Sequence, residues 1–179
     1  MKNFTVGPVQ SPTYLRKIGS KNVPYFRTEE FSHLMLENEK LILKLAGASE
    51  DSKVAFMTCS GTGSMEASVV CSLTKKDKVL LVNGGSFGLR FKEILDLYNI
   101  PNKQILLKPG EALTEKHLKA FDKDSFTALV VNMCETSTGV LYDMNLISKF
   151  VKKHNLFFIV EKKNLYETGR RDYLAGMEK

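Results

Sequence analysis

The sequence predicts an α/β fold, arranged as a three-layer αβα sandwich around a mostly parallel sheet. From residue 54 to residue 160, short apolar runs alternate with segments of helical periodicity. The apolar runs are also continuous, since residues 79–82 read VLLV and residues 128–131 read ALVV. Continuous runs are typical of strands that helices cover on both faces. We therefore expect about five strands with helices on both sides of the sheet.

An arm and one helix precede this alternation. Residues 1–28 contain Gly-Pro and Ser-Pro turn signals, and we interpret them as an extended arm without a core of its own. A helix is predicted from Glu29 to about Gly47, because Thr28 can cap its N-terminus and two glutamates begin it. Its apolar residues recur at helical spacing, so this helix is expected to be amphipathic.

Strands and helices then follow in turn. Strands are predicted at 54–57, 78–83, 104–108, 127–133 and 156–160. Helices are predicted between them at 64–73, 87–98, 114–121 and 145–154. The last residues, 162–179, have a partly helical apolar period and are read as a tail. The predicted organisation is thus an arm (1–28), an α/β domain (29–161) and a tail (162–179).

The composition is that of an ordinary globular protein. The 179 residues are 43% hydrophobic and 26% charged, and no apolar run approaches the roughly 18 residues of a membrane span. The net charge of +6 comes mostly from dispersed lysine pairs, without the interleaved aromatic residues of a nucleic-acid surface. Cys59, Cys71 and Cys134 are too widely spaced for a disulfide framework or a metal site. We expect a cytoplasmic protein that binds no metal, nucleic acid or membrane.

The first candidate site is a small polar turn. Ligands of open α/β sheets bind beyond the carboxyl ends of the strands, and Ser60, Gly61 and Thr62 follow the first predicted strand. They also open a helix, where free N–H groups, the helix dipole and two hydroxyls favour an anion such as phosphate. The turn lacks the lysine of a P-loop and the GxGxxG spacing of a dinucleotide site. A tight turn with a simple helix cap is the alternative.

Two other strand ends add an aromatic ring and a carboxylate. Phe87 lies in the glycine-rich turn 83–88, where its ring can project over a planar ligand or can begin the core of the next helix. Glu161 ends an apolar strand, where a carboxylate needs a partner or water. An anion cradle, a ring and a carboxylate together suit a flat phosphorylated heterocycle with a basic nitrogen.

Four segments carry a family resemblance. In this order, SGTGSMEA, NGGSFGLRF, ETSTGVLYD and HNLFFIVE resemble the class V aminotransferases, pyridoxal-phosphate enzymes of fold type I. The segments FTVGPVQ and YFRTEEF are similar to the alanine–glyoxylate and 2-aminoethylphosphonate transaminase branch. The resemblance implies that the sheet is part of the fold type I large domain and that the protein is a homodimer. It implies amino-group transfer between a small amino acid or amine and a 2-oxo acid, pyruvate or glyoxylate.

The resemblance also implies pyridoxal 5'-phosphate as cofactor and six residues that bind it: Ser60, Gly61, Thr62, Phe87, Thr136 and Glu161. The first three match the phosphate cradle of the family. Phe87 matches the ring that stacks on the pyridine, and Thr136 matches a hydroxyl residue at that ring. Glu161 stands where the family has an aspartate that pairs with the pyridine nitrogen and keeps the ring an electron sink.

The resemblance ends after residue 160. In the family the Schiff-base lysine comes later, and Lys162 and Lys163 do not stand at its position, so we interpret them as a solvated pair. No catalytic residue is assigned, and the chain alone is expected to be an incomplete, inactive form of the enzyme. Two alternatives stay open: a non-catalytic module or partner subunit that binds pyridoxal phosphate or another phosphate ligand, and a nucleotide-binding α/β protein.

Overall fold

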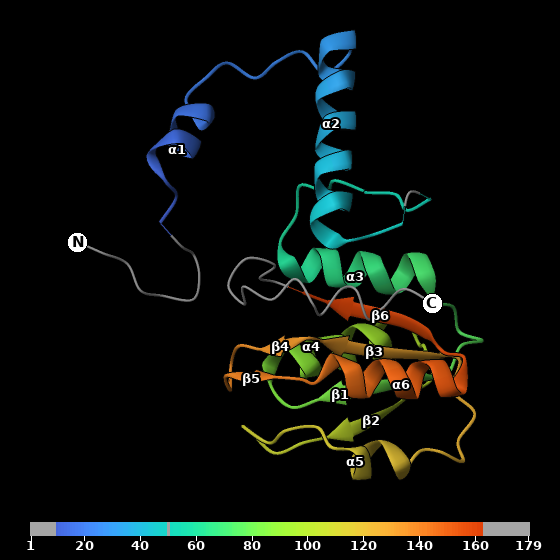
Figure 1. Cartoon of the computed structure of the whole chain (residues 1–179). Coiled ribbons are helices and arrows are strands. Elements are labelled where there is room, and N and C mark those ends of the chain that lie inside the picture. The colour runs from blue at the N-terminus through green and yellow to red at the C-terminus, as the bar shows by residue number, and fades with distance from the viewer. Residues whose placement is uncertain (1–9, 50, 163–179) are drawn as a thin grey trace. The chain divides into compact units, whose positions relative to one another are not determined.

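The computed structural model describes residues 10–49 and 51–162 (Figure 1). The chain divides into two compact units, Met1–Ala55 and a second that begins at Phe56. The predicted tail lies outside the described residues except for Lys162. The predicted division into arm, α/β domain and tail follows the family resemblance and stays a prediction.

The first unit holds two helices, α1 (Thr13–Gly19) and α2 (Glu29–Ala46). The arm was predicted to be extended, but it contains a helix: α1 begins directly after Pro12, a residue whose fixed φ suits the start of a helix. The prediction for α2 is confirmed, because the Thr28 side chain accepts the N–H of Phe31 at 3.2 Å and Gly47 ends the helix at a φ of 61°. No residue of either helix is buried.

The second unit contains the parallel sheet that the sequence predicts. Its order is β2-β1-β3-β6, and every neighbouring pair is parallel. The strands are β1 (Val79–Asn83), β2 (Asn102–Leu106), β3 (Ala128–Asn132) and β6 (Phe157–Glu161). A separate antiparallel pair joins β4 (Cys134–Glu135) to β5 (Val140–Leu141). The fold class is thus confirmed, whereas the short β4–β5 hairpin was not predicted.

The strand predicted at 54–57 is wrong. These residues have no strand structure, and Phe56 and Met57 are 48% and 54% exposed. The N–H of Val54 donates to Oε1 of Glu39 at 3.2 Å instead of to a strand. An apolar run becomes a strand only where another strand pairs with it, and no described strand does so here. The described parallel sheet therefore has four strands and not five.

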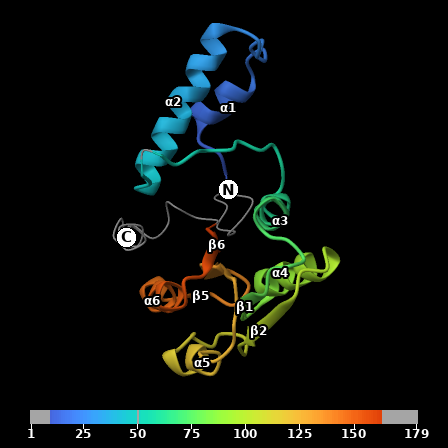
Figure 2. The ribbon, with the colours of Figure 1, turned by 90° about the vertical axis from the view of Figure 1, so that its right-hand side faces the viewer.

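Helices cover both faces of the sheet, as predicted. They are α3 (Gly61–Ser72), α4 (Ser86–Leu97), α5 (Glu115–Lys119) and α6 (Met144–His154). Alternate residues of β1 separate the two cores: Val79 and Leu81 pack in the cluster of α3 and α4, and Leu80 and Val82 pack in the cluster of α5 and α6. Figure 2 shows the two pairs of helices on opposite sides of the strands.

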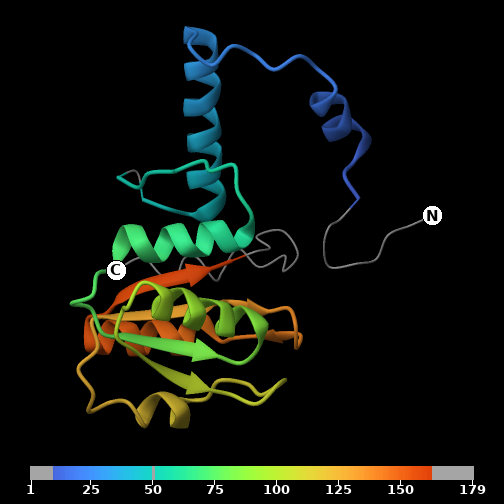
Figure 3. The ribbon, with the colours of Figure 1, turned by 180° about the vertical axis from the view of Figure 1, so that it is seen from behind.

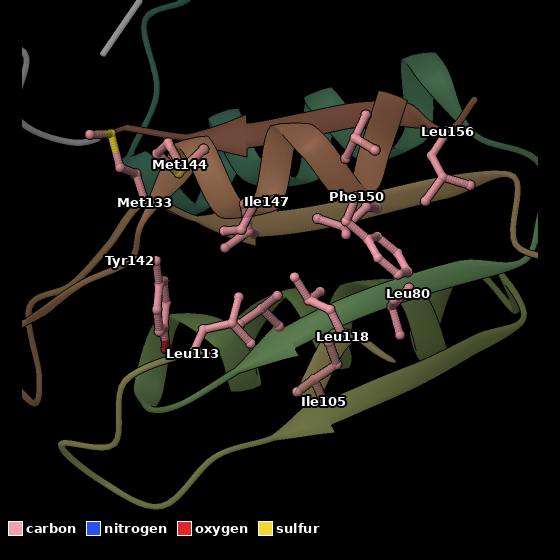
Figure 4. Close-up of a cluster of buried hydrophobic side chains, with 14 of the residues drawn as sticks. Leu80, Ile105, Leu113, Leu118, Met133, Tyr142, Met144, Ile147, Phe150 and Leu156 are labelled. Carbon is pink, nitrogen blue, oxygen red and sulfur yellow. The ribbon is translucent and has the colours of Figure 1, made fainter. Parts of the chain in front are cut away.

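Every residue of β1 and β3 is buried, which explains their continuous apolar sequences. Figure 4 shows the core on the α5 and α6 side, where Ile147 and Phe150 lie over Leu80 and Leu118.

The carboxyl ends of the strands lie along one edge. In Figure 1 the arrowheads of β1, β3 and β6 point to the side at which the β4–β5 hairpin lies and α3 begins. Figure 3 shows the same edge from behind. The predicted site residues belong to segments at this edge, where open α/β sheets bind their ligands.

Candidate functional site

The polar turn forms the N-terminus of α3. Ser60 is the N-cap residue, and its Oγ accepts the N–H of Gly63 at 3.1 Å. Gly61 and Thr62 are the first helical residues, and both are exposed. The prediction that this turn opens a helix is confirmed, although no strand among residues 10–49 and 51–59 precedes it. Backbone N–H groups of the first turn and the positive end of the helix dipole favour an anion at this point.

An open cleft of about 360 Å³ lies between α3 and the end of β6. This volume falls within the roughly 300–1,000 Å³ of small-molecule sites. Its lining residues come from both elements: Gly61, Ser64, Met65, Ser68, Val160, Glu161 and Lys162. The cleft brings together Gly61 and Glu161, two of the six predicted residues, which are 100 positions apart in the sequence (161 − 61).

The cleft combines groups of opposite charge. The N-terminus of α3 favours negative charge, and the carboxylate of Glu161 favours a cation or a protonated nitrogen. Lys162, one of the two lysines interpreted as a solvated pair, also lines this open cleft and is half-buried. Because β6 ends at Glu161, strand alternation no longer directs the next side chain to the opposite face. Lys163 lies outside the described residues.

Phe87 lies in the first turn of α4, and its backbone is held by a distant carboxylate. The N-cap residue Gly85 has no side chain to cap the helix. Glu135 of β4 takes this role, because its carboxylate accepts the N–H of Phe87 at 3.2 Å and of Gly88 at 3.1 Å. Glu135 is fully buried. Thr136, which follows it, is half-buried in the loop between β4 and β5.

Glycines at the start of α4 permit this close approach. A Cβ atom on Gly85 would lie 2.6 Å from Cγ and Cδ of Glu135, and one on Gly84 would lie 2.2 Å from the hydroxyl of Tyr142. Burial, followed by the negative charge of Glu135, raises the pKa of Tyr142 to about 12. The glycine-rich sequence before Phe87 is thus explained by packing against β4 and β5.

Neither Phe87 nor Thr136 lines the α3–β6 cleft. The six predicted residues form two groups: Ser60, Gly61, Thr62 and Glu161 at the cleft or beside its lining, and Phe87 and Thr136 beside Glu135. Sequence reasoning missed Glu135. The signal was present, because Glu135 stands only three residues after the end of the buried strand β3, and a buried glutamate needs a partner.

In the described part of the chain, no group of three or more His, Cys, Asp and Glu side chains is arranged to hold a metal ion. None of the described helices combines the length and the apolar character needed to cross a membrane.

No family model matches the chain. Among known proteins, it is 32% identical to an uncharacterized aminotransferase of Helicobacter pylori over 88% of this chain and 42% of the relative. It is 32% identical to a protein of a Synechococcus strain named the small subunit of a soluble hydrogenase, over 86% of this chain and 41% of that protein. It is 27% identical to a 2-aminoethylphosphonate–pyruvate transaminase of Vibrio vulnificus, over 90% and 46%. The chain spans less than half the length of these relatives.

Solved structures support the same fold. The pyridoxamine–pyruvate aminotransferase of Mesorhizobium loti superposes with a TM-score of 0.81 at 21% identity, over 89% of this chain and 41% of that one. The ureidoglycine–glyoxylate aminotransferase of Bacillus subtilis superposes with a TM-score of 0.79 at 20% identity, over 86% of this chain and 40% of that one. This chain is a homologue of the N-terminal half of the class V aminotransferases.

Homologous class V aminotransferases are pyridoxal-phosphate enzymes, and the chemistry of the cleft fits that cofactor. The first turn of α3 offers backbone N–H donors for a phosphate, with Gly61 and Thr62 exposed and no atom within 4 Å of the position of a Cβ on Gly61. Glu161, also on the cleft lining, offers a carboxylate for a protonated ring nitrogen. These groups are of the chemical kinds that suit the phosphate and the ring nitrogen of this cofactor.

Proposed function

We propose that this chain forms the phosphate-binding side of a pyridoxal-phosphate site in a class V aminotransferase. The complete enzyme moves an amino group between a small amino acid or amine and pyruvate or glyoxylate. One observation supports this most: Gly61, at the N-terminus of α3, and Glu161, at the end of β6, line one cleft. The proposed acceptors are supported by the names of similar transaminases, which include pyruvate or glyoxylate.

Each residue has a proposed task. Ser60 fixes the turn through Gly63, so that the N–H groups of Gly61 and Thr62 and the Thr62 hydroxyl hold the phosphate. Glu161 pairs with the ring nitrogen and keeps it protonated. When bound, the cofactor supplies an electron sink for the substrate. Glu161 is one methylene longer than the aspartate of the family, so we propose that the ring lies slightly farther from the end of β6.

Phe87 and Thr136 complete the proposed site from the neighbouring strand ends. The Phe87 ring stacks on the pyridine, and the Thr136 hydroxyl contacts the ring from the β4–β5 loop. Stacking and hydrogen bonds are each worth roughly 1–3 kcal/mol. With these contacts alone, we expect weak and reversible binding.

The second candidate function is a binding module without chemistry. It is favoured by one observation: Lys162, the one lysine on the lining of the cleft among the described residues, directly follows β6 and does not match the family's lysine by position. The polypeptide of residues 1–179 then binds the cofactor but does not transfer an amino group. A second polypeptide that completes the site would restore transfer.

The test is binding of pyridoxal phosphate to the purified chain, followed by desalting. We expect saturable binding that desalting removes, weakened about tenfold by Ser60→Ala together with Thr62→Ala and by Glu161→Gln. Ser148→Ala, on the exposed side of α6, is the matched control. Equal binding by all variants would refute the proposed site. A visible absorbance band that survives desalting and disappears in Lys162→Ala would show that this chain holds the aldehyde covalently and would refute the second candidate.

We propose that the protein is a homodimer, supported by the apolar side chains that α2 exposes, among them Leu36 (54%) and Leu41 (57%). We also propose a cytoplasmic location, supported by three cysteines whose odd number and wide spacing in the sequence do not suit a disulfide framework.

A further inference from the structure

The carboxylate of Glu135 lies at the junction of two segments that are about 50 residues apart. It accepts hydrogen bonds from four donors: the N–H of Phe87 at 3.2 Å, the N–H of Gly88 at 3.1 Å, Nδ2 of Asn132 at 3.3 Å and Oγ of Ser137 at 2.5 Å. Its exposed fraction is 0%. A buried carboxylate is costly unless its lone pairs are satisfied, and here donors surround it.

The junction requires a carboxylate in particular. Every contact places a donor against the side chain, and a carboxylate has an acceptor at each of its two oxygens. A glutamine of the same shape would turn an NH₂ group toward one set of donors. The N-terminus of α4 adds its positive dipole, which attracts an acceptor side chain at this position.

The same loop holds α4 at a second point. Oγ of Ser137 accepts the N–H of Ser86 at 3.1 Å while it donates to Glu135. A side chain on Gly85 would collide with both Glu135 and Ser137 at 2.6 Å. The start of α4 and the β4–β5 hairpin are therefore fixed to each other by hydrogen bonds and by close packing.

Glu135 thereby links two residues with proposed roles at the cofactor ring. Phe87 donates its N–H to the carboxylate, and Thr136 is the next residue in the chain. We propose that Glu135 is a positioning residue: its carboxylate sets the Phe87 ring and the Thr136 hydroxyl in one fixed arrangement for the pyridine ring. The identity of the ligand rests on the proposed function, whereas the positioning of Phe87 does not.

A helix cap that only stabilises the protein would behave differently. Its loss would lower the stability of the protein, but it would not weaken the binding of a ring-containing ligand more than the binding of inorganic phosphate. Asp143 offers the matched control, because its Oδ1 caps α6 through the N–H groups of Asn145 at 2.9 Å and Leu146 at 3.2 Å. Glu135→Gln and Asp143→Asn both replace a capping carboxylate by its amide.

The first experiment compares pyridoxine phosphate, which carries the ring without the aldehyde, with inorganic phosphate. In the 179-residue chain, Glu135→Gln should weaken the binding of pyridoxine phosphate by about tenfold and change the affinity for inorganic phosphate by no more than about twofold. Asp143→Asn should change the affinity for either ligand by no more than about twofold. The proposal is overturned if Glu135→Gln has no effect on pyridoxine phosphate, if it weakens both ligands alike, or if Asp143→Asn has the same effect.

A second measurement needs no ligand and a milder variant. The chain is labelled with para-fluorophenylalanine, and the Phe87 resonance is assigned by its loss in Phe87→Leu. Glu135→Gln and Ser137→Ala should shift or broaden this fluorine resonance, whereas Asp143→Asn should leave it unchanged. An unchanged resonance in folded Ser137→Ala and Glu135→Gln overturns the positioning of Phe87. If the wild type binds neither ligand, the proposed function fails, and the fluorine resonance alone decides the role of Glu135.

Discussion

The hydroxyl of Tyr142 is buried, and no described residue offers it a hydrogen bond. A buried hydroxyl without a partner costs free energy relative to the ring alone. Tyr142→Phe is therefore expected to leave the free energy of unfolding unchanged or to raise it by about 1 kcal/mol at neutral pH. Chemical denaturation measures this difference, with Tyr25→Phe, a change at a 61% exposed tyrosine, as the control.

The same tyrosine makes stability depend on alkaline pH. Its pKa is raised from 10 to about 12 in the folded chain, so its contribution to stability is complete below pH 10. As the pH rises from 10 toward 12, the unfolded chain loses this proton first and the folded state is destabilised. The advantage of Tyr142→Phe over wild type should grow across this interval. Parallel pH profiles of the two proteins would contradict the raised pKa.

Gly85, the N-cap residue of α4, is expected to be essential for the stability of this helix start. Because a Cβ there would lie 2.6 Å from Glu135, Gly85→Ala must displace the carboxylate or α4, at a cost of about 1–3 kcal/mol in the free energy of unfolding. Gly61→Ala is the matched control, since no atom lies within 4 Å of its Cβ position and it also stands at a helix start. Thermal unfolding of both variants measures the costs. Equal stability would mean that the junction at Glu135 is looser than the distances indicate.

The elements show what the sequence can predict. β1 and β3 were predicted within one residue at the start, because all their residues are buried and apolar. β2 begins two residues earlier than predicted, since Asn102 and Lys103 are polar residues that a search for apolar runs leaves out. The hairpin of β4 and β5 has two residues in each strand, so its sequence has too few positions for a period to be recognised.

In the candidate site, too, features with local sequence signals were predicted, and features that depend on distant residues were missed. The turn at Ser60 was correctly predicted to open a helix, because Ser60 and the glycines are local signals, although α3 begins at Gly61 and not at residue 64. Glu135 was missed because its partners, Phe87 and Gly88, are 48 and 47 residues away. The run 54–57 was misread because burial depends on neighbouring strands, which its own sequence does not contain.

At the scale of the molecule, α2 leaves apolar side chains exposed. Leu36 and Leu41 are 54% and 57% exposed, and no residue of the helix is buried. We expect this surface to associate, so light scattering should give the mass of a dimer at micromolar concentration. Leu41→Glu should shift the equilibrium toward the monomer, and Lys40→Glu, its exposed neighbour, should not. A monomeric wild type across this range would contradict the proposed homodimer.

The central claim is that the N-terminus of α3 and Glu161 hold the two ends of pyridoxal phosphate. Amide chemical shifts recorded while this ligand is added to the chain test that claim most directly. We predict saturable shifts at Gly61 and Thr62 that inorganic phosphate also causes, and a shift at Glu161 that only the ring-containing ligand causes. Shifts confined to other segments, or no saturable shift at Gly61 and Thr62, would contradict the account.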